Sequence, residues 1–167
     1  MRVLICDDEE NIRNLLAKYL LIENFEVEKA ENGLSAQRLM KEMPFNAVVV
    51  DLKMPGMDGL ELMKWIRDEG YKMPIIMVSA YGEISDAVKA LKLGAHDYIE
   101  KPFDPEEVVL KLRNLMDAYN LNEYVEKAGK GLLLSSPFSY PKSSDSRRFS
   151  GTPPMLIATN GPDETDD

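Results

Sequence analysis

The segment AVVVD, residues 47–51, joins four consecutive apolar residues to one aspartate. An uninterrupted apolar run of this kind is typical of a parallel strand buried on both faces of a sheet. Three other apolar runs also lead into a polar loop residue: residues 3–5 precede Asp7-Asp8, residues 75–78 precede Ser79, and residues 98–99 precede Lys101. The carboxyl ends of parallel strands lie at one edge of a sheet, so we expect these side chains to share a site.

Strand-like and helix-like segments alternate along the chain. Expected strands cover residues 2–6, 25–30, 47–50, 75–78 and 97–99, and expected helices cover 10–21, 33–43, 58–68, 84–93 and a segment from 104 onward. The apolar stripe of the second helix is predicted to comprise Leu34, Leu39, Met40 and Met43. Successive βα units with right-handed crossovers predict an α/β fold, a doubly wound parallel five-stranded sheet with helices on both faces.

Length, composition and charge restrict the possible classes of protein. The 167 residues suffice for one domain and a tail. No apolar run approaches the roughly 20 residues of a membrane span. The net charge of −9, with no basic stripe, disfavours direct binding of nucleic acid by this chain. Cys6 is the only cysteine, which excludes a disulfide within the chain and fits a reducing compartment. We therefore expect a cytoplasmic protein without membrane association.

The last expected helix passes the edge of the predicted domain, residues 1–120. It carries apolar side chains at helical spacing to about residue 128, namely Val108, Leu112, Leu115, Tyr119, Val125 and Ala128. Two interpretations remain open: an exposed helix end that frays, or an extension that pairs with a second chain. Residues 129–167 are rich in serine, proline and glycine and are expected to form a disordered tail or linker.

Asp7, Asp8 and Asp51 are expected to bring their carboxylates to the same edge of the sheet. Acidic residues at a helix start often only complement the helix dipole. Clustered carboxylates, however, raise one another's pKa unless a cation is present, and Mg²⁺ is the natural oxygen-bound candidate. A Lys101 ammonium can neutralise phosphoryl oxygens and a Ser79 hydroxyl can donate to one. The pattern therefore favours phosphoryl chemistry with a carboxylate nucleophile.

Residues 1 to about 120 resemble the receiver domain of two-component response regulators. The resemblance rests on the combined order and spacing of these motifs: Asp7-Asp8, Asp51, residues 54–59, Ser79-Ala80, Gly94-Ala95 and Lys101-Pro102-Phe103. Residues 51–59 and 79–83 are most similar to receivers of sigma-54-dependent (NtrC-type) transcription activators, although residues 129–167 contain no Gly-rich phosphate-loop motif. The resemblance implies a flavodoxin-like (βα)5 fold with strand order 2-1-3-4-5.

The same resemblance implies a role for each site residue. Asp51 would be the phosphoacceptor, with Ser79 and Lys101 holding the phosphoryl group. The implied metal is Mg²⁺, with Mn²⁺ as the alternative. Its implied ligands are Asp8, which binds directly, Asp7, which acts mainly through water, Asp51 and the backbone carbonyl of Lys53.

The resemblance also implies partners and an output. A histidine kinase or phosphotransfer protein would donate the phosphoryl group, and the domain would catalyse only its own phosphorylation and dephosphorylation. Ser79 and Tyr98 would act as switch residues. The face built from the fourth helix, fifth strand and fifth helix would then change, which would control a phosphorylation-dependent homodimer or another output.

Two other classes of protein share parts of this pattern. A metal-dependent phosphohydrolase with Asp51 as covalent nucleophile is the main alternative. Enzymes similar to haloacid dehalogenases, however, carry aspartates two positions apart after the first strand, whereas Asp7 and Asp8 are adjacent. A flavin-binding module has the same type of sheet, but acidic residues 7–10 occupy the loop that would hold its phosphate.

Overall fold

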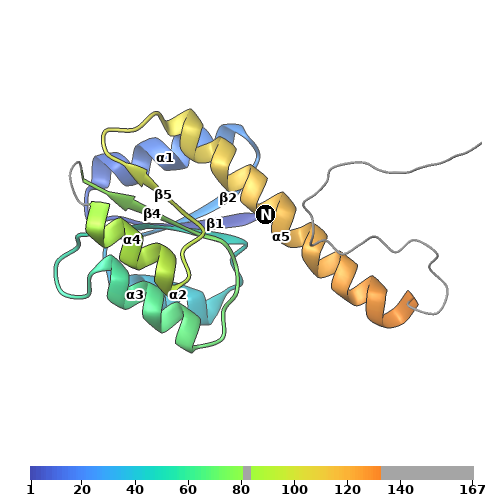
Figure 1. The fold of residues 1–167 in the computed structure, drawn as a ribbon. Coiled ribbons are helices and arrows are strands. Elements are labelled where there is room, and N and C mark those ends of the chain that lie inside the picture. The colour runs from blue at the N-terminus through green and yellow to red at the C-terminus, as the bar shows by residue number, and fades with distance from the viewer. Residues whose placement is uncertain (81–83, 133–167) are drawn as a thin grey trace, which may run out of the picture. The chain divides into compact units, whose positions relative to one another are not determined.

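The computed structural model describes residues 1–80 and 84–132 (Figure 1). Its strands are β1 (Arg2–Cys6), β2 (Glu26–Ala30), β3 (Ala47–Asp51), β4 (Ile75–Ser79) and β5 (Asp97–Glu100). Its helices are α1 (Glu10–Ile22), α2 (Gly33–Glu42), α3 (Gly59–Asp68), α4 (Ile84–Leu93) and α5 (Pro105–Leu132). In the part of the chain so described, no helix combines the length and apolar character that a membrane crossing requires.

All five strands are parallel and form one sheet in the order β2-β1-β3-β4-β5. This order confirms the predicted flavodoxin-like sheet. The register pairs Cys6 with Val50 and Asp51 with Val78, so the ends of β1, β3 and β4 lie next to one another. The second strand, which carries none of the predicted site residues, lies at the edge.

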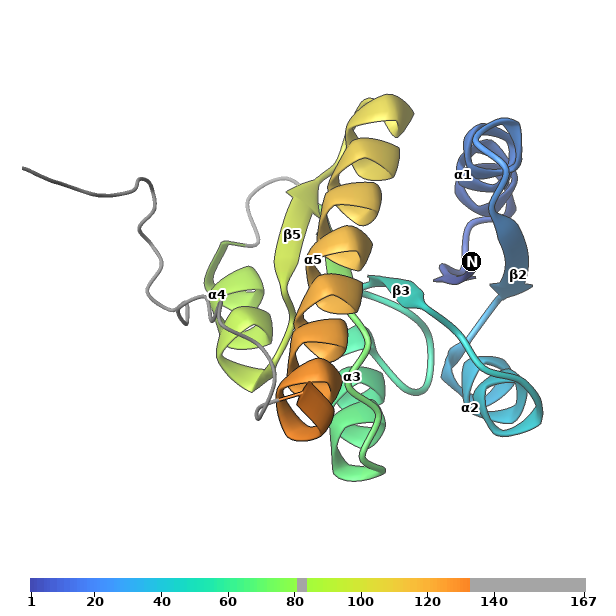
Figure 2. The same ribbon diagram turned by 90° about the vertical axis from the view of Figure 1, so that its right-hand side faces the viewer.

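Helices cover both faces of the sheet, as predicted (Figures 1 and 2). One hydrophobic cluster joins the sheet to α2, α3 and α4 through buried side chains such as Ala36, Leu62 and Ala90. The other joins the opposite face to α1 and α5 through side chains such as Leu16 and Leu112. Neighbouring strand residues alternate between the clusters, as in β1, where Leu4 and Ile5 face opposite sides. The sheet is therefore a rigid support for the loops at its carboxyl edge.

Helix α5 continues past residue 128 to Leu132. The structure therefore differs from the expected tail boundary at 129, because residues 129–132 are helical. Val108, Leu112 and Met116 are fully buried, whereas Leu121 is 61% exposed. The remainder of the expected tail, residues 133–167, lies outside the described residues. The domain boundary near 120 and the disorder of the tail stay predictions.

The loop between β3 and α3 brings the start of α3 against the end of β3. Asp58 caps α3 by accepting a hydrogen bond from the Glu61 amide at 2.9 Å, and the Glu61 side chain accepts one from the Asp58 amide at 3.1 Å. A Cβ atom at Gly59 would lie against the Asp51 carbonyl oxygen and 2.8 Å from Leu52 Cα. Glycine at position 59 thus permits the close approach that fixes the position of Asp51.

Candidate functional site

Four loops at the carboxyl edge of the sheet hold the predicted site residues. Asp7 directly follows β1, Asp51 ends β3, Ser79 ends β4 and Lys101 directly follows β5. The Lys101 amide donates a 2.7 Å hydrogen bond to the carbonyl oxygen of Ser79, which joins two of these loops directly. The Lys101–Pro102 peptide bond is cis. The sheet topology therefore gathers residues from most of the length of the domain.

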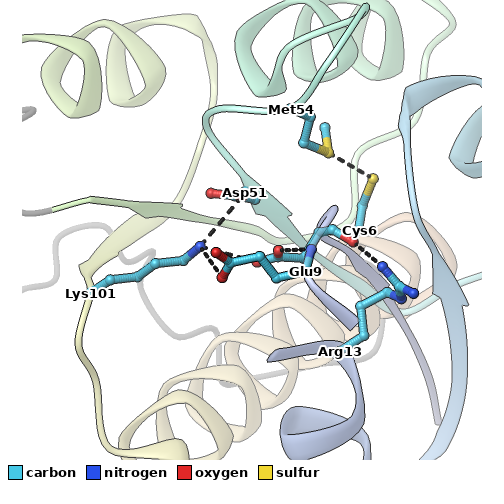
Figure 3. Close-up of polar contacts among 7 residues, drawn as sticks. Cys6, Glu9, Arg13, Asp51, Met54 and Lys101 are labelled. Atoms are coloured by element: carbon cyan, nitrogen blue, oxygen red, sulfur yellow. Dashed lines mark hydrogen bonds and ion pairs between the residues drawn. The ribbon is translucent and has the colours of Figure 1, made fainter. Parts of the chain in front are cut away.

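The Lys101 ammonium lies among three carboxylates (Figure 3). Its Nζ atom is 3.4 Å from Asp7 Oδ2, 3.4 Å from Asp51 Oδ2 and 3.5 Å from Glu9 Oε1. The Asp7 and Asp51 side chains are only 4% and 6% exposed, whereas that of Glu9 is 59% exposed. Lys101 thus places one positive charge between two buried carboxylates and one at the surface.

The carboxylate of Asp7 is held by its surroundings. The Oδ1 atom of Asp7 accepts a 2.8 Å hydrogen bond from the Glu9 amide, and the Asp7 backbone amide donates a 3.1 Å bond to the carbonyl oxygen of Ala30, the last residue of β2. Arg13 Nη1 donates a 2.7 Å bond to the Asp7 carbonyl oxygen. These contacts leave Oδ2 facing Lys101 and fix its direction.

Burial and like charge make the carboxylates of this site difficult to ionise. Desolvation and the neighbouring charge of Asp7 raise the pKa of Asp51 to about 7, although Lys101 opposes the change. Desolvation also raises the pKa of Asp7 above its ordinary value. Burial disfavours the charged form of Lys101, but Asp51, Asp7 and Glu9 together hold its pKa above the ordinary value. Added positive charge would stabilise the ionised carboxylates.

Asp7, Asp8 and Asp51 form a donor set suited to a divalent cation. Each offers one carboxylate oxygen, and the three oxygens lie within 4.8 Å of one another. Asp7 and Asp51 are buried, while Asp8 is exposed and open to solvent. All three ligands are hard oxygen atoms, which suit Mg²⁺ or Mn²⁺. The raised pKa values of the two buried carboxyls agree with this fit, because such an ion favours their ionised forms.

The buried thiol of Cys6 does not compete for the chemistry of the site. Desolvation, followed by the charges of Asp7 and Asp51, raises its pKa to about 12, so the thiol stays neutral. Its sulfur contacts the Met54 sulfur at 3.5 Å in the loop after β3 (Figure 3). Cys6 therefore packs beneath the site, and its neutral thiol is not a nucleophile there.

The two predicted switch residues lie on adjacent strands. Ser79 is 2% exposed at the end of β4. Tyr98 lies on β5, where it pairs with Met77, and is partly buried against the cluster that contains Ala90 of α4. The backbone carbonyl that is predicted to face the metal belongs to Lys53, an exposed residue in the loop after β3. Its role as a ligand and the switching roles of Ser79 and Tyr98 remain predictions.

Sequence reasoning missed Arg13 and the contact of Glu9 with Lys101. Glu9 was visible only as part of an acidic run that precedes a helix. Arg13 occupies an ordinary polar position of α1, and its target is a backbone carbonyl, which leaves no trace in a residue pattern. The position of Arg13 one turn after an acidic loop is the only signal that the sequence offers.

Residues 3–113 match the response regulator receiver domain. The match covers more than half of the chain, and the chain belongs to this family. It is accordingly a receiver domain of a response regulator in two-component signalling. The family assignment agrees with the motifs in the sequence and with the site at the carboxyl edge of the sheet.

Individual relatives are response regulators of the NtrC type. Regulatory protein AtoC of Escherichia coli (strain K12) is 34% identical over 134 residues, which are 80% of this chain and 29% of AtoC. An NtrX-like response regulator of Rickettsia bellii (strain RML369-C) is 41% identical over 121 residues, which are 71% of this chain and 25% of that protein. The chain thus spans between a quarter and a third of the length of these curated relatives.

Solved structures show the same fold. A crystal structure of NtrX from Brucella abortus matches with a TM-score of 0.72 and 32% identity, covering 75% of this chain and 29% of NtrX. The receiver domain of the same NtrX matches with a TM-score of 0.67 and 33% identity, covering 69% of this chain and 98% of that domain. The second match confirms that the similarity is to a receiver domain.

Proposed function

We propose that Asp51 accepts a phosphoryl group from a phosphohistidine on a histidine kinase or phosphotransfer protein. The observation that carries this proposal is the position of Lys101, 3.4 Å from both Asp51 and Asp7 beside the three-carboxylate cluster. A buried nucleophile, a fixed cation and a set of oxygen ligands are the parts that phosphoryl transfer requires, because its catalysis consists mainly of positioning and charge neutralisation.

Each site residue has a defined task in the proposed transfer. A carboxylate oxygen of Asp51 forms the new bond to phosphorus as the bond between phosphorus and the donor nitrogen breaks. The Lys101 ammonium donates a hydrogen bond to one phosphoryl oxygen, and the Ser79 hydroxyl donates one to a second phosphoryl oxygen. Asp7, Asp8, Asp51 and the backbone carbonyl of Lys53 would hold Mg²⁺ or Mn²⁺, which would supply further charge neutralisation.

Phosphorylation would then shift the population of two conformations. The new group brings negative charge between Ser79 and Lys101, which draws both side chains toward it. Ser79 lies on β4 beside β5, where Tyr98 packs partly buried against the cluster that includes α4. A movement of Ser79 would therefore change the packing of Tyr98 and the position of α4. This is the route by which we propose that the site controls output.

A phosphoryl donor of low molecular mass tests this function against the phosphohydrolase alternative. The wild-type chain incubated with phosphoramidate and Mg²⁺ should gain the mass of a single phosphoryl group, as measured by intact-protein mass spectrometry. Asp51→Asn should gain none, and Asp68→Asn, which changes an exposed aspartate on α3, should behave as wild type. Repeated turnover of phosphomonoesters by the wild-type chain, lost in Asp51→Asn, would support a hydrolase instead.

We also propose a homodimer that forms on phosphorylation through α4 and neighbouring elements. Three apolar side chains follow one another at helical spacing on α4 and are exposed: Ile84 by 50%, Val88 by 40% and Leu91 by 38%. Sedimentation velocity should show an increase in mass when wild type is phosphorylated, and none for Asp51→Asn under the same conditions. A phosphorylated wild-type chain that stays monomeric at high concentration would refute the dimer.

A further inference from the structure

Arg13 reaches from the first turn of α1 back to the loop that carries the acidic residues (Figure 3). Its Nη1 atom donates to the carbonyl oxygen of Asp7 at 2.7 Å. This distance lies at the short end for N–H···O hydrogen bonds, as charge-assisted bonds do. The guanidinium is thus directed at the backbone of Asp7 and not at its carboxylate.

The carbonyl that Arg13 contacts belongs to the peptide unit between Asp7 and Asp8. A peptide unit is planar, so a bond that holds its oxygen also fixes the direction of the Asp8 amide. The other polar groups of Asp7 are already engaged by Ala30, Glu9 and Lys101. Within the described residues, the hydrogen bond from Arg13 is the side-chain contact that holds the orientation of the peptide unit between Asp7 and Asp8.

We infer that Arg13 is a positioning residue, which holds the Asp7–Asp8 peptide so that both carboxylates converge with that of Asp51. The inference rests on the metal-dependent function proposed above. Arg13 has two opposite effects on a bound cation: its charge repels the ion, while its hydrogen bond orders two of the ligands. Because the guanidinium is directed at a carbonyl oxygen, we expect the ordering effect to exceed the repulsion.

Binding of Mg²⁺ to the unphosphorylated chain separates these two effects. In isothermal titration calorimetry, Arg13→Met should raise the Kd for Mg²⁺ about tenfold, the effect of losing one charge-assisted hydrogen bond. Arg13→Lys keeps the charge but not the planar donor group, and should raise the Kd by roughly threefold or more. An unchanged or lowered Kd in both variants, with folding intact by circular dichroism, would overturn the inference.

Arg38→Met is the matched control. Arg38 is exposed on α2 and lines the same polar cleft of about 400 Å³ as Arg13. Its replacement removes the same charge and the same kind of side chain without touching Asp7, so the Kd should stay within about twofold of wild type. An equal increase of Kd in Arg38→Met and Arg13→Met would assign the effect to general charge and would also overturn the inference.

A second measurement examines the contact without metal. In ¹H–¹⁵N correlation spectra of the metal-free chain, Arg13→Met or Arg13→Lys should shift the Asp8 amide resonance, because that amide shares its peptide unit with the contacted carbonyl. Arg38→Met should leave it in place. If wild type binds no Mg²⁺, the proposed metal dependence fails by itself, while this resonance still decides the role of Arg13. An unmoved Asp8 resonance in both Arg13 variants refutes that role.

Discussion

Lys101→Met is expected to slow the phosphorylation of Asp51 by roughly a hundredfold at a fixed, subsaturating Mg²⁺ concentration, a magnitude typical of the loss of one group that stabilises transition-state charge. Two effects act in the same direction. The variant loses the ammonium that would donate to the phosphoryl oxygens. It also loses the cation that opposes the raised pKa of Asp51, so that less of this carboxyl is ionised at pH 7. Initial rates with phosphoramidate, followed by mass spectrometry, give the measurement.

The pH dependence of Lys101→Met separates these two effects. Raising the pH should recover the part of the rate that was lost because Asp51 is protonated, and should leave the loss due to missing charge neutralisation. Lys64→Met is the control, because Lys64 is exposed on α3, away from the site, and its ammonium forms an ion pair with Asp68 at 2.8 Å. A Lys101→Met rate close to that of Lys64→Met would contradict the role assigned to Lys101.

Asp51→Asn is expected to stabilise the metal-free chain at pH 8 by about 4 kcal/mol, which corresponds to roughly 15 °C in Tm for a domain of this size. The folded pKa of Asp51 is about 7, whereas the ordinary value is 3.8. The folded state therefore retains a proton that the unfolded state releases, and wild-type stability falls as pH rises from about 4 to 7. Asparagine removes this penalty because it does not ionise.

The pH profile makes the stability prediction specific. The advantage of Asp51→Asn should be complete above about pH 7 and should disappear near pH 4, where the wild-type carboxyl is protonated in both states. Urea unfolding at several pH values measures it, with Asp68→Asn as a surface control that changes stability by less than about 1 kcal/mol. Equal stability of wild type and Asp51→Asn at pH 8 would show that Asp51 carries no such penalty.

The gathering of Asp7, Asp51 and Lys101 was predictable from the sequence. Apolar runs identified the strands, and the rule that parallel strands end at one edge then placed their following residues together. The contacts to the Asp7 backbone were not predictable, because the Arg13 side chain reaches a carbonyl that every residue possesses. Reasoning from side-chain types finds the ligands of a site more readily than the residues that orient them.

Helix faces and helix ends were predicted less well. Periodicity placed Leu34 on the apolar stripe of α2, yet Leu34 is 68% exposed. The buried positions of that helix include Gly33 and Ala36, small residues that allow close packing; a Cβ at Gly33 would lie 2.6 Å from the Met57 sulfur. The composition near Gly129 indicated a tail, whereas α5 continues to Leu132. Tertiary packing and helix propagation outweigh local preference at these positions.

Chemical trapping of the phosphorylated residue tests the central claim most directly. Borohydride reduces an aspartyl phosphate to homoserine, and tandem mass spectrometry of the peptides then locates the modified position. After treatment of the wild-type chain with phosphoramidate and Mg²⁺, we expect homoserine at position 51 and at no other aspartate. Homoserine at position 7 or 8 with Asp51 unmodified, or a stable phosphate on Ser79, would contradict the assignment of Asp51 as phosphoacceptor.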